Sequence, residues 1–308
     1  MSQYDEVKSV LDKYEDALLS YQRVHAVGIG YKEVDGIRTD ELEIIVYVHA
    51  NTSVEKYVEA EHVPLEIEGI PVEFIAETEP MLDVLPVAYE IVRPTDQARY
   101  RPLVGGIQIF LNYYRSEWVG TLGTFVKSKD PSDDHLYILS NQHVLKADGL
   151  TVFQPRPGVL NLVGSTTVTQ EFPDADAGLA LVNDPSDVDV NMIEDIGLVN
   201  ETHDVTVDDL SKRVRKRGRT TLLTEGTIEA INVAINLVGG TRQYDCVRVR
   251  ADEGELFSSP GDSGSCVVLV EDNALVGLHF AGNGIAGGAS FFSKIGNVFD
   301  NLNVELPE

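Results

Sequence analysis

Cysteine is scarce in this chain, which has only Cys246 and Cys266 among its 308 residues. So few cysteines exclude a small secreted domain held together by several disulfides. They leave open two buried free thiols or one disulfide between neighbouring strands. Neither cysteine belongs to a pair with metal-ligand spacing, and the acidic loop 184–195 lacks the spacing of an EF-hand. We therefore expect no metal and no cofactor.

Long apolar runs are also absent. No stretch approaches the length of about 20 apolar residues that a membrane-spanning helix needs. The first residues, Met1–Glu6, are acidic and lead into an amphipathic pattern, unlike the basic and then apolar start of a secretory signal. The sequence predicts a cytoplasmic protein without a membrane partner.

Basic side chains are the third deficit. The chain has 24 Lys and Arg against 50 Asp and Glu, which gives a formal net charge of −26. Such a charge repels a phosphate backbone and excludes nucleic acid as a general partner. Residues 1–92 hold 20 acidic and 6 basic side chains, so the acidity is densest there. Two explanations of this acidity are a surface that keeps the protein soluble and an origin in a saline environment, and the sequence alone does not separate them.

One segment departs from this acidity. Lys212–Arg219 contains six positive charges in eight residues. Three roles are compatible with it: a nucleic-acid patch, neutralisation of acidic surroundings, or docking of the acidic N-terminal third. The segment has no interleaved aromatic side chains, which disfavours the first role.

The N-terminus has a helical pattern. Apolar and tyrosine side chains recur at alternating spacings of three and four, which predicts a helix within residues 1–22 with one apolar seam. The seam consists of Tyr4, Val7, Leu11, Tyr14, Leu18 and Tyr21. It packs on the neighbouring domain or pairs with another subunit.

Residues 23–92 have the pattern of a small α+β module. We expect strands over 24–32 and 43–48, a helix near 53–60 and a strand pair from Pro64 to about residue 76. Gly28 and Gly30 lie within a strand and do not open a helix, so they are not a dinucleotide-binding motif.

Turn signals mark the boundaries of these elements. Val34-Asp35-Gly36 predicts a turn between the first two strands, and Glu68-Gly69 separates the strand pair. The region from Pro80 to Pro102, with Pro86 and Pro94, reads as a connection, and we assign 93–102 as the linker.

From residue 103 to about 305 the pattern changes to many short strands separated by turn signals. This predicts an all-β region of barrel or sandwich type, closed by a short helix near 293–302.

Three short stretches in the all-β region carry the chemistry. Pro260–Ser265 places Ser263 on a glycine-flanked turn, Ser140–Leu145 contains His143, and Asp174–Leu181 contains Asp176. Serine needs a base to act as a nucleophile, and the base needs a partner that holds its tautomer. The chain supplies these residues in the order His, Asp, Ser.

Alternatives exist for two of the three positions. Asp174 competes with Asp176, because both precede the same apolar strand. Of the other histidines, most lack a strand lead-in like that of His143 and are assigned to structure. These are His25, His49, His62, His135 and His203.

These stretches resemble a known family. The C-terminal two thirds is similar to the chymotrypsin-fold (trypsin-like) serine peptidases, and is closest to intracellular bacterial and archaeal trypsin-like peptidases related to the plant NARROW LEAF 1 protein. The resemblance also reaches the strand 27–32. The matching segments are Gly120–Gly123, Tyr137–Leu145, Asp176–Ala180, Gly218–Thr221 with Gly226-Thr227, and Gly261–Ser265.

The resemblance implies a mainly β fold, a chymotrypsin-like double β-barrel preceded by the N-terminal helix and the α+β module. The first barrel would span 103–200 and the second 201–308. Ser263 would be the nucleophile, His143 the general base and Asp176 its orienting partner, with the N–H groups of Gly261 and Ser263 as the oxyanion hole.

The resemblance also points to a specificity pocket made of Phe257, Ser258, His279 and Phe280. Phe257 stands where trypsins have the aspartate that binds Lys or Arg, so tryptic specificity is not expected. His279 and Ser258 fall where glutamyl endopeptidases place the groups that hold a P1 glutamate. A small apolar pocket with His279 facing elsewhere remains the alternative.

The sequence therefore predicts an intracellular serine endopeptidase acting on protein or peptide substrates. In secreted trypsins the counterpart of Asp262 pairs with a newly cut N-terminus, but about a hundred residues precede the first barrel here and no Ile-Val-Gly-Gly-type activation site is evident. We expect residues 1–92 to gate the enzyme or to present a regulatory partner or a second copy of the chain. The alternative function is a catalytically silent protease-like scaffold that binds protein partners.

Overall fold

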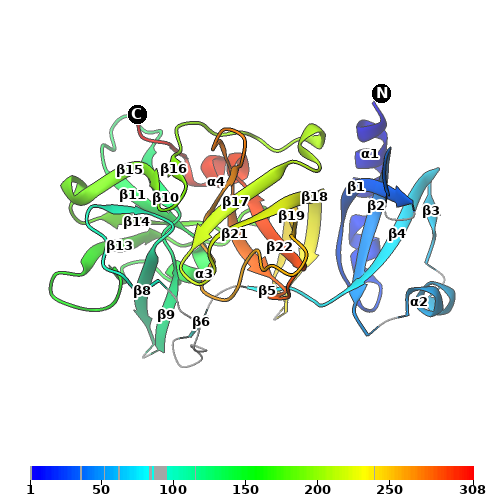
Figure 1. The fold of residues 1–308 in the computed structure, drawn as a ribbon, viewed down its shortest axis with the longest axis horizontal. Coiled ribbons are helices and arrows are strands. Elements are labelled where there is room, and N and C mark those ends of the chain that lie inside the picture. Colours follow the sequence, from blue (N-terminus) through cyan, green and yellow to red (C-terminus); the bar gives the residue numbers. More distant parts are fainter. Residues whose placement is uncertain are drawn as a thin grey trace.

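The fold is built mainly from strands, arranged at three places along the molecule (Figure 1). The computed structural model describes residues 2–34, 37–51, 53–61, 63–82, 85–86, 96–114, 116–238 and 240–308. Asp35 and Gly36 of the expected turn, His62, and Pro94 of the expected linker lie outside the described residues. No described helix has the length and apolarity needed to cross a membrane.

The N-terminal elements match the predicted α+β pattern. Helix α1 begins with a capping box in which Ser2 and Asp5 bond each other's backbone amides, and the other elements follow in the expected order. They are α1 (Gln3–Ser20), β1 (Val24–Val34), β2 (Ile37–His49), α2 (Val54–Glu61), β3 (Glu66–Ile67) and β4 (Ile70–Glu77). Strands β1 and β2 are antiparallel, and β4 joins β2 in parallel.

The C-terminal strands form a closed six-stranded barrel. Its strands pair in the order β17-β20-β21-β22-β19-β18, and β18 returns to β17. They are β17 (Arg213–Gly218), β18 (Leu222–Asn236), β19 (Arg242–Ala251), β20 (Cys266–Leu269), β21 (Leu275–Gly282) and β22 (Ala289–Lys294). Helix α4 (Ile295–Leu302) follows β22, as predicted for the C-terminus.

The intervening strands form a nine-stranded sheet at the far end of the molecule (Figure 1). Its order is β23-β10-β11-β14-β13-β12-β8-β9-β6. These strands are β6 (Leu85–Pro86), β8 (Gln108–Tyr113), β9 (Ser116–Thr121), β10 (Thr124–Ser128), β11 (Leu136–Ser140), β12 (Thr151–Phe153), β13 (Leu162–Val168), β14 (Gly178–Val182) and β23 (Val304–Glu305). A small sheet joins β16 (Gly197–Leu198), β15 (Val188–Ile193) and β7 (Leu103–Gly105).

The N-terminal sheet is continuous with the C-terminal barrel, which the sequence did not predict. Strand β1 pairs antiparallel with β18, so β18 belongs to the barrel and also extends the sheet to β1 and β2. Gly28 and Gly30 serve this junction, because a Cβ at either would meet Val233 or the Glu229 carbonyl at 2.8–2.9 Å. The division of the chain into domains at 92 and 102 stays a prediction.

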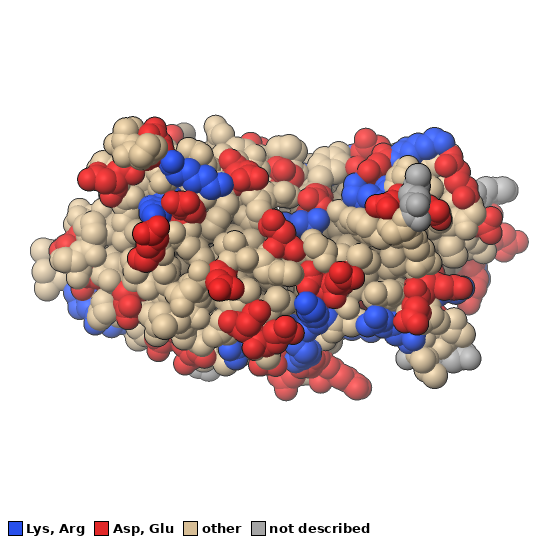
Figure 2. Space-filling model, turned by 90° about the horizontal axis from the view of Figure 1, so that it is seen from above, with Lys and Arg blue, Asp and Glu red and all other residues tan. Residues whose placement is uncertain are grey.

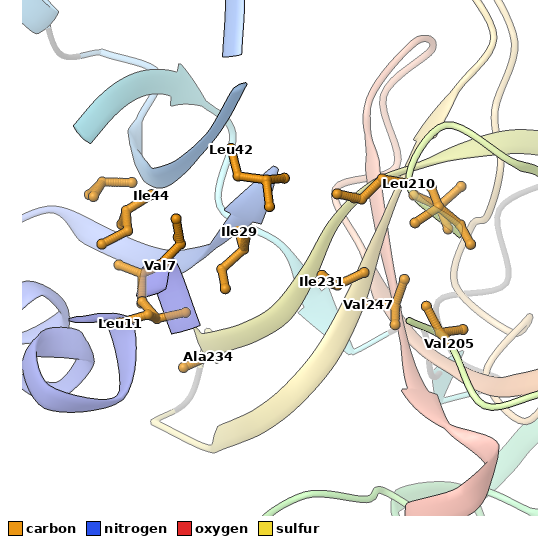
Figure 3. Close-up of a cluster of buried hydrophobic side chains, with 14 of the residues drawn as sticks. Val7, Leu11, Ile29, Leu42, Ile44, Val205, Leu210, Ile231, Ala234 and Val247 are labelled. Carbon is orange, nitrogen blue, oxygen red and sulfur yellow. The ribbon is translucent and has the colours of Figure 1, made fainter. Parts of the chain in front are cut away.

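One hydrophobic core spans this junction. Val7 and Leu11 of α1 pack over β1 and β2, and the same cluster continues through Ile231 of β18 to Val247 of β19 (Figure 3). Burying one such side chain stabilises the fold by about 1.5–3 kcal/mol. The seam of α1 therefore packs inside its own chain, the first of the two uses considered for it.

The packing of the N-terminal elements on the C-terminal barrel determines the path of the chain that connects them to the nine-stranded sheet. Along the chain the N-terminal elements precede the nine-stranded sheet, yet in space the C-terminal barrel lies between the two (Figure 1). The connection must therefore pass along the barrel. There β5 (Met81–Leu82) pairs with β21, and β6 then pairs with β9.

The surface is as acidic as the composition requires. Acidic side chains are scattered over the whole face in Figure 2, with fewer basic ones between them. The basic segment 212–219 pairs with acids of the barrel and of its neighbours: Lys212 with Asp209, Arg213 with Glu225 and Asp252, and Arg217 with Asp96 and Asp195. Neutralisation of acidic surroundings is the role that these contacts support.

Candidate active site

The turn that carries Ser263 depends on two glycines. Gly261 and Gly264 have φ values of 103° and 94°, in the region that favours glycine. A Cβ on Gly261 would lie 2.5 Å from Thr220 Oγ1, and one on Gly264 would collide with the Thr121 carbonyl. The backbone of this turn therefore requires the two glycines that flank Asp262 and Ser263.

Asp262, between Gly261 and Ser263, is fully buried. Its carboxylate accepts hydrogen bonds from the amides of Thr220 at 2.7 Å and Ser259 at 3.0 Å and from Thr221 Oγ1 at 2.7 Å. Lys216 Nζ, equally buried, lies 3.3 Å away. Burial by itself would raise the pKa of Asp262, but the Lys216 ammonium and these hydrogen bonds outweigh it and hold that pKa below its usual value.

His143 lies on the short helix α3 (Gln142–Leu145), beside Asp176. Its Nδ1 is hydrogen-bonded to Asp176 Oδ2, and its backbone amide donates to Asp176 Oδ1 at 3.2 Å. Asn141 Nδ2 donates to the Asp176 carbonyl at 2.6 Å, and Ser293 Oγ accepts from the Asp176 amide at 3.1 Å. These contacts fix the carboxylate against one ring nitrogen of His143.

Asp174, the competing carboxylate, is placed elsewhere. Its Oδ1 accepts a hydrogen bond from Asn301 Nδ2 at 2.9 Å. The structure therefore brings Asp176, and not Asp174, next to His143.

The Ser263 hydroxyl is buried and donates to the Phe280 carbonyl at 3.0 Å. Within the described part of the chain, the outer nitrogen of His143, Nε2, is buried without a hydrogen-bond partner. The nucleophile candidate thus points to β21, while the base candidate has an open acceptor site.

The oxyanion-hole candidates lie on the same turn. The Ser263 carbonyl accepts from the Thr121 amide at 2.8 Å, and the Gly261 carbonyl accepts from Thr121 Oγ1 at 2.9 Å. Between the described residues, no backbone bond donated by the amides of Gly261 or Ser263 is present. Among the described residues, these two N–H groups therefore have no backbone acceptor.

The four expected pocket residues are all buried. The rings of Phe257 and His279 meet edge to face with their centroids 6.2 Å apart. Ser258 Oγ lies 2.8 Å from Ser290 Oγ, a partner that the sequence did not indicate. Phe280 contributes its carbonyl to Ser263, while its ring packs in a different hydrophobic cluster from Phe257.

A cavity of about 260 Å³ opens beside the His143–Asp176 pair. Lys146 lines it, with its ammonium 3.6 Å from the centre of the Trp118 ring. Burial lowers the pKa of Lys146 to about 8, although the nearby Asp176 acts in the opposite direction. This cation next to the pair was missed in the sequence, where its only signal was its position three residues after His143.

Lys216 is a second residue near the site that the sequence did not single out. The sequence showed it only as one of six charges in a basic segment, and nothing in the spacing distinguished it from its neighbours. Its burial on Asp262 separates it from Lys212 and Arg213, which pair at the surface.

Other features fall outside the site. The described part of the chain contains no group of three or more His, Cys, Asp or Glu side chains that could hold a metal. Cys246 and Cys266 are both free and buried. Of the structural histidines, His25 contacts Glu77, His135 contacts Asp133 and His203 contacts Asp209.

No family model matches this sequence. Its structure, however, is similar to solved structures of proteases. Thermobifida fusca Protease A is 20% identical, with a TM-score of 0.50 over 66% of this chain and 97% of that one. A glutamic acid specific serine protease is 21% identical, with a TM-score of 0.52 over 67% of this chain and all of that one. The chain has the chymotrypsin-like fold.

The chymotrypsin-like fold confirms the architecture predicted from the sequence. Nocardiopsis Protease (NAPase) gives the same result, with 18% identity and a TM-score of 0.50 over 67% of this chain and 98% of that one. These matches span nearly the whole of each neighbour but only two thirds of this chain. About one third of the chain therefore lies outside the shared fold.

Proposed function

We propose that this chain is an intracellular serine endopeptidase that cleaves proteins through an acyl-enzyme. The observation that carries the proposal is the buried His143–Asp176 pair, with Nε2 of His143 open and Ser263 on a glycine turn of the neighbouring barrel. The intracellular setting rests on the sequence alone, as does the closer relation to the NARROW LEAF 1 group.

In this reaction the Ser263 hydroxyl turns from the Phe280 carbonyl to His143 Nε2 and attacks the scissile carbonyl carbon. His143 takes the hydroxyl proton and passes it to the leaving amine, and water then releases the acyl group by the same route. Asp176 holds the tautomer with the proton on Nδ1 and stabilises the imidazolium. The N–H groups of Gly261 and Ser263 stabilise the oxyanion, and one such donor is worth about 2.7–4 kcal/mol.

Lys216 supports activity without proteolytic activation. Its ammonium neutralises Asp262, which fixes the backbone of the nucleophile turn at Ser259 and ties that turn to Thr220 between β17 and β18. Lys216 thus supplies to Asp262 the positive charge that a newly cut N-terminus supplies to its counterpart in secreted trypsins.

We further propose a preference for glutamate at P1. His279 is buried with its ring edge to face against Phe257, and Ser258, the residue after Phe257, lies 2.8 Å from Ser290, so an imidazole and two hydroxyls are buried in this part of the barrel. A neighbour in fold is described as a glutamic acid specific serine protease that uses a histidine triad in substrate binding.

For P1 specificity, matched peptides with Glu, Leu or Ala at P1 are the test. We expect the Glu peptide to have a kcat/KM about 10-fold higher or more, because a charge-assisted hydrogen bond to a desolvated carboxylate contributes about 1.5–3 kcal/mol. His279→Leu should remove this advantage. Equal rates for the three peptides would leave the small apolar pocket as the better description.

A fluorophosphonate probe tests the protease proposal directly. We expect the wild-type chain to be labelled and Ser263→Ala to remain unlabelled, because the probe reacts only with an activated serine. Ser132→Ala is the control, an exposed serine hydrogen-bonded to Asp130 and placed in none of the site's roles, which should keep the label. Labelling that survives in Ser263→Ala would contradict the assignment of the nucleophile.

The second candidate function is a silent scaffold that binds protein partners. It is favoured by one observation, the burial of Ser263 with its hydroxyl on Phe280. The absence of labelling in the wild-type chain, together with a normal melting temperature, is its expected signature. Gating by residues 1–92 remains part of our proposal for the active enzyme.

A further inference from the structure

The segment that leaves the N-terminal elements runs directly beside the reacting groups. In β5, Leu82 pairs antiparallel with Ala281 and Met81 with Gly282. Ala281 follows Phe280, whose carbonyl accepts the Ser263 hydroxyl. The chain thus adds a strand to β21 one residue away from the contact of the nucleophile candidate.

Leu82 also reaches the other half of the site. Its side chain lines the 260 Å³ cavity together with His143 and Asp176, and it packs on the cluster that contains Phe280 and Ala281. A single residue therefore contacts the surroundings of both the nucleophile and the base.

The segment then continues onto the sheet that carries His143. In β6, Leu85 pairs antiparallel with Val119 and Pro86 with Trp118 of β9. Strand β9 continues to Gly120, which packs closely on the residue after His143: a Cβ at Gly120 would lie 2.5 Å from Val144. The two short pairings lie on the two sides of the site.

Many proteins bind an extended peptide as an added strand at the edge of a sheet. Main-chain hydrogen bonds then give affinity, and pockets for the side chains give specificity. Accepting the proposed function, we propose that β5 and β6 occupy the peptide-binding groove of the active site as a tethered strand of the chain itself. An external substrate must displace them. The docking of β1 on β18 enforces this route, because it sets the start of the linker at the far side of the barrel (Figure 1).

Among the residues that the structure describes, each of the two pairings is two residues long, short enough for the occupant to exchange with a substrate. Its effect is on binding: if the groove is open one tenth of the time, the apparent affinity for a peptide falls about tenfold. This identifies the part of residues 1–92 that gates the enzyme.

The test is Leu82→Asp in the full-length chain, with Leu65→Asp as the matched control. Leu65 is 61% exposed, so the same charge there should change nothing. A carboxylate at position 82 faces the Phe280 cluster and should expel β5. We expect a KM for a fluorogenic peptide about tenfold lower in Leu82→Asp and unchanged in Leu65→Asp. A synthetic peptide of residues 79–88 should inhibit Leu82→Asp more strongly than wild type.

Hydrogen exchange separates this inference from the proposed function. In a Ser263→Ala background, those amides within 281–282 and 118–119 that face β5 and β6 should lose protection when Leu82→Asp is added, and not with Leu65→Asp. Lost protection with no fluorophosphonate labelling of the wild-type chain would support the tethered strand and reject the protease. Unchanged protection together with unchanged KM would overturn the tethered strand.

Discussion

Replacing His143 with alanine is expected to lower kcat on a peptide substrate by about 10⁶-fold, the loss typical for the base of a catalytic triad. The reason is that Ser263 then has no group to take its proton, while the oxyanion donors and the binding groove remain. The measurement is kcat under saturating peptide, with the melting temperature as a check that the variant is folded.

The carboxylates offer a sharper comparison within the same experiment. Asp176→Asn should lower kcat about 10⁴-fold, because an amide favours the wrong tautomer of His143. Asp174→Asn removes the same charge two residues away and keeps an oxygen that can accept from Asn301, so its kcat should stay within a few-fold of wild type. Similar losses in the two variants would contradict the role given to Asp176.

Lys216→Met is expected to destabilise the fold by about 3–5 kcal/mol, because it leaves the Asp262 carboxylate buried without its cation. Both groups are fully buried, and their atoms lie 3.3 Å apart. Because Asp262 holds the backbone around Ser263, the folded fraction should also lose fluorophosphonate labelling. Lys216→Arg keeps the charge and should retain part of both properties.

The control for this variant is Lys127→Met. Lys127 pairs with Glu305 at 3.3 Å, with 34% and 49% of the two side chains exposed, so its loss should cost less than about 1 kcal/mol. Urea unfolding at neutral pH measures both differences. Equal stabilities for Lys216→Met and wild type, with labelling intact, would contradict the support that we assign to the buried pair.

The pH dependence of the same two proteins provides a second readout. In the wild type the pKa of Asp262 lies below its usual value, so its contribution to stability is complete above the unfolded pKa and declines as the pH falls through the folded one. In Lys216→Met, burial raises the pKa of Asp262, so the folded variant protonates first. Its deficit in stability should therefore begin to shrink above about pH 4, as the pH falls through the raised pKa of the variant, and should shrink further as the wild type loses its own contribution at lower pH.

Local patterns in the sequence determined the elements and the order of the site residues. The three- and four-residue spacing gave α1, turn signals bounded the strands, and the glycines around Ser263 required the turn that the structure shows. These features depend on neighbours a few residues apart, which is why the sequence alone could predict them. The choice of Asp176 over Asp174 came from the family pattern.

Only the tertiary structure decided which distant groups meet. Lys216 and Asp262 are 46 residues apart, and nothing local distinguishes that lysine from the other charges of its segment. Nothing local in the sequence indicates the pairing of β1 with β18 or the position of Leu82 beside His143 and Asp176. Both depend on how the N-terminal sheet, the barrel and the nine-stranded sheet are arranged in space. Long-range pairing depends on how the complete chain packs, and burial then determines which cations and which strand reach the site.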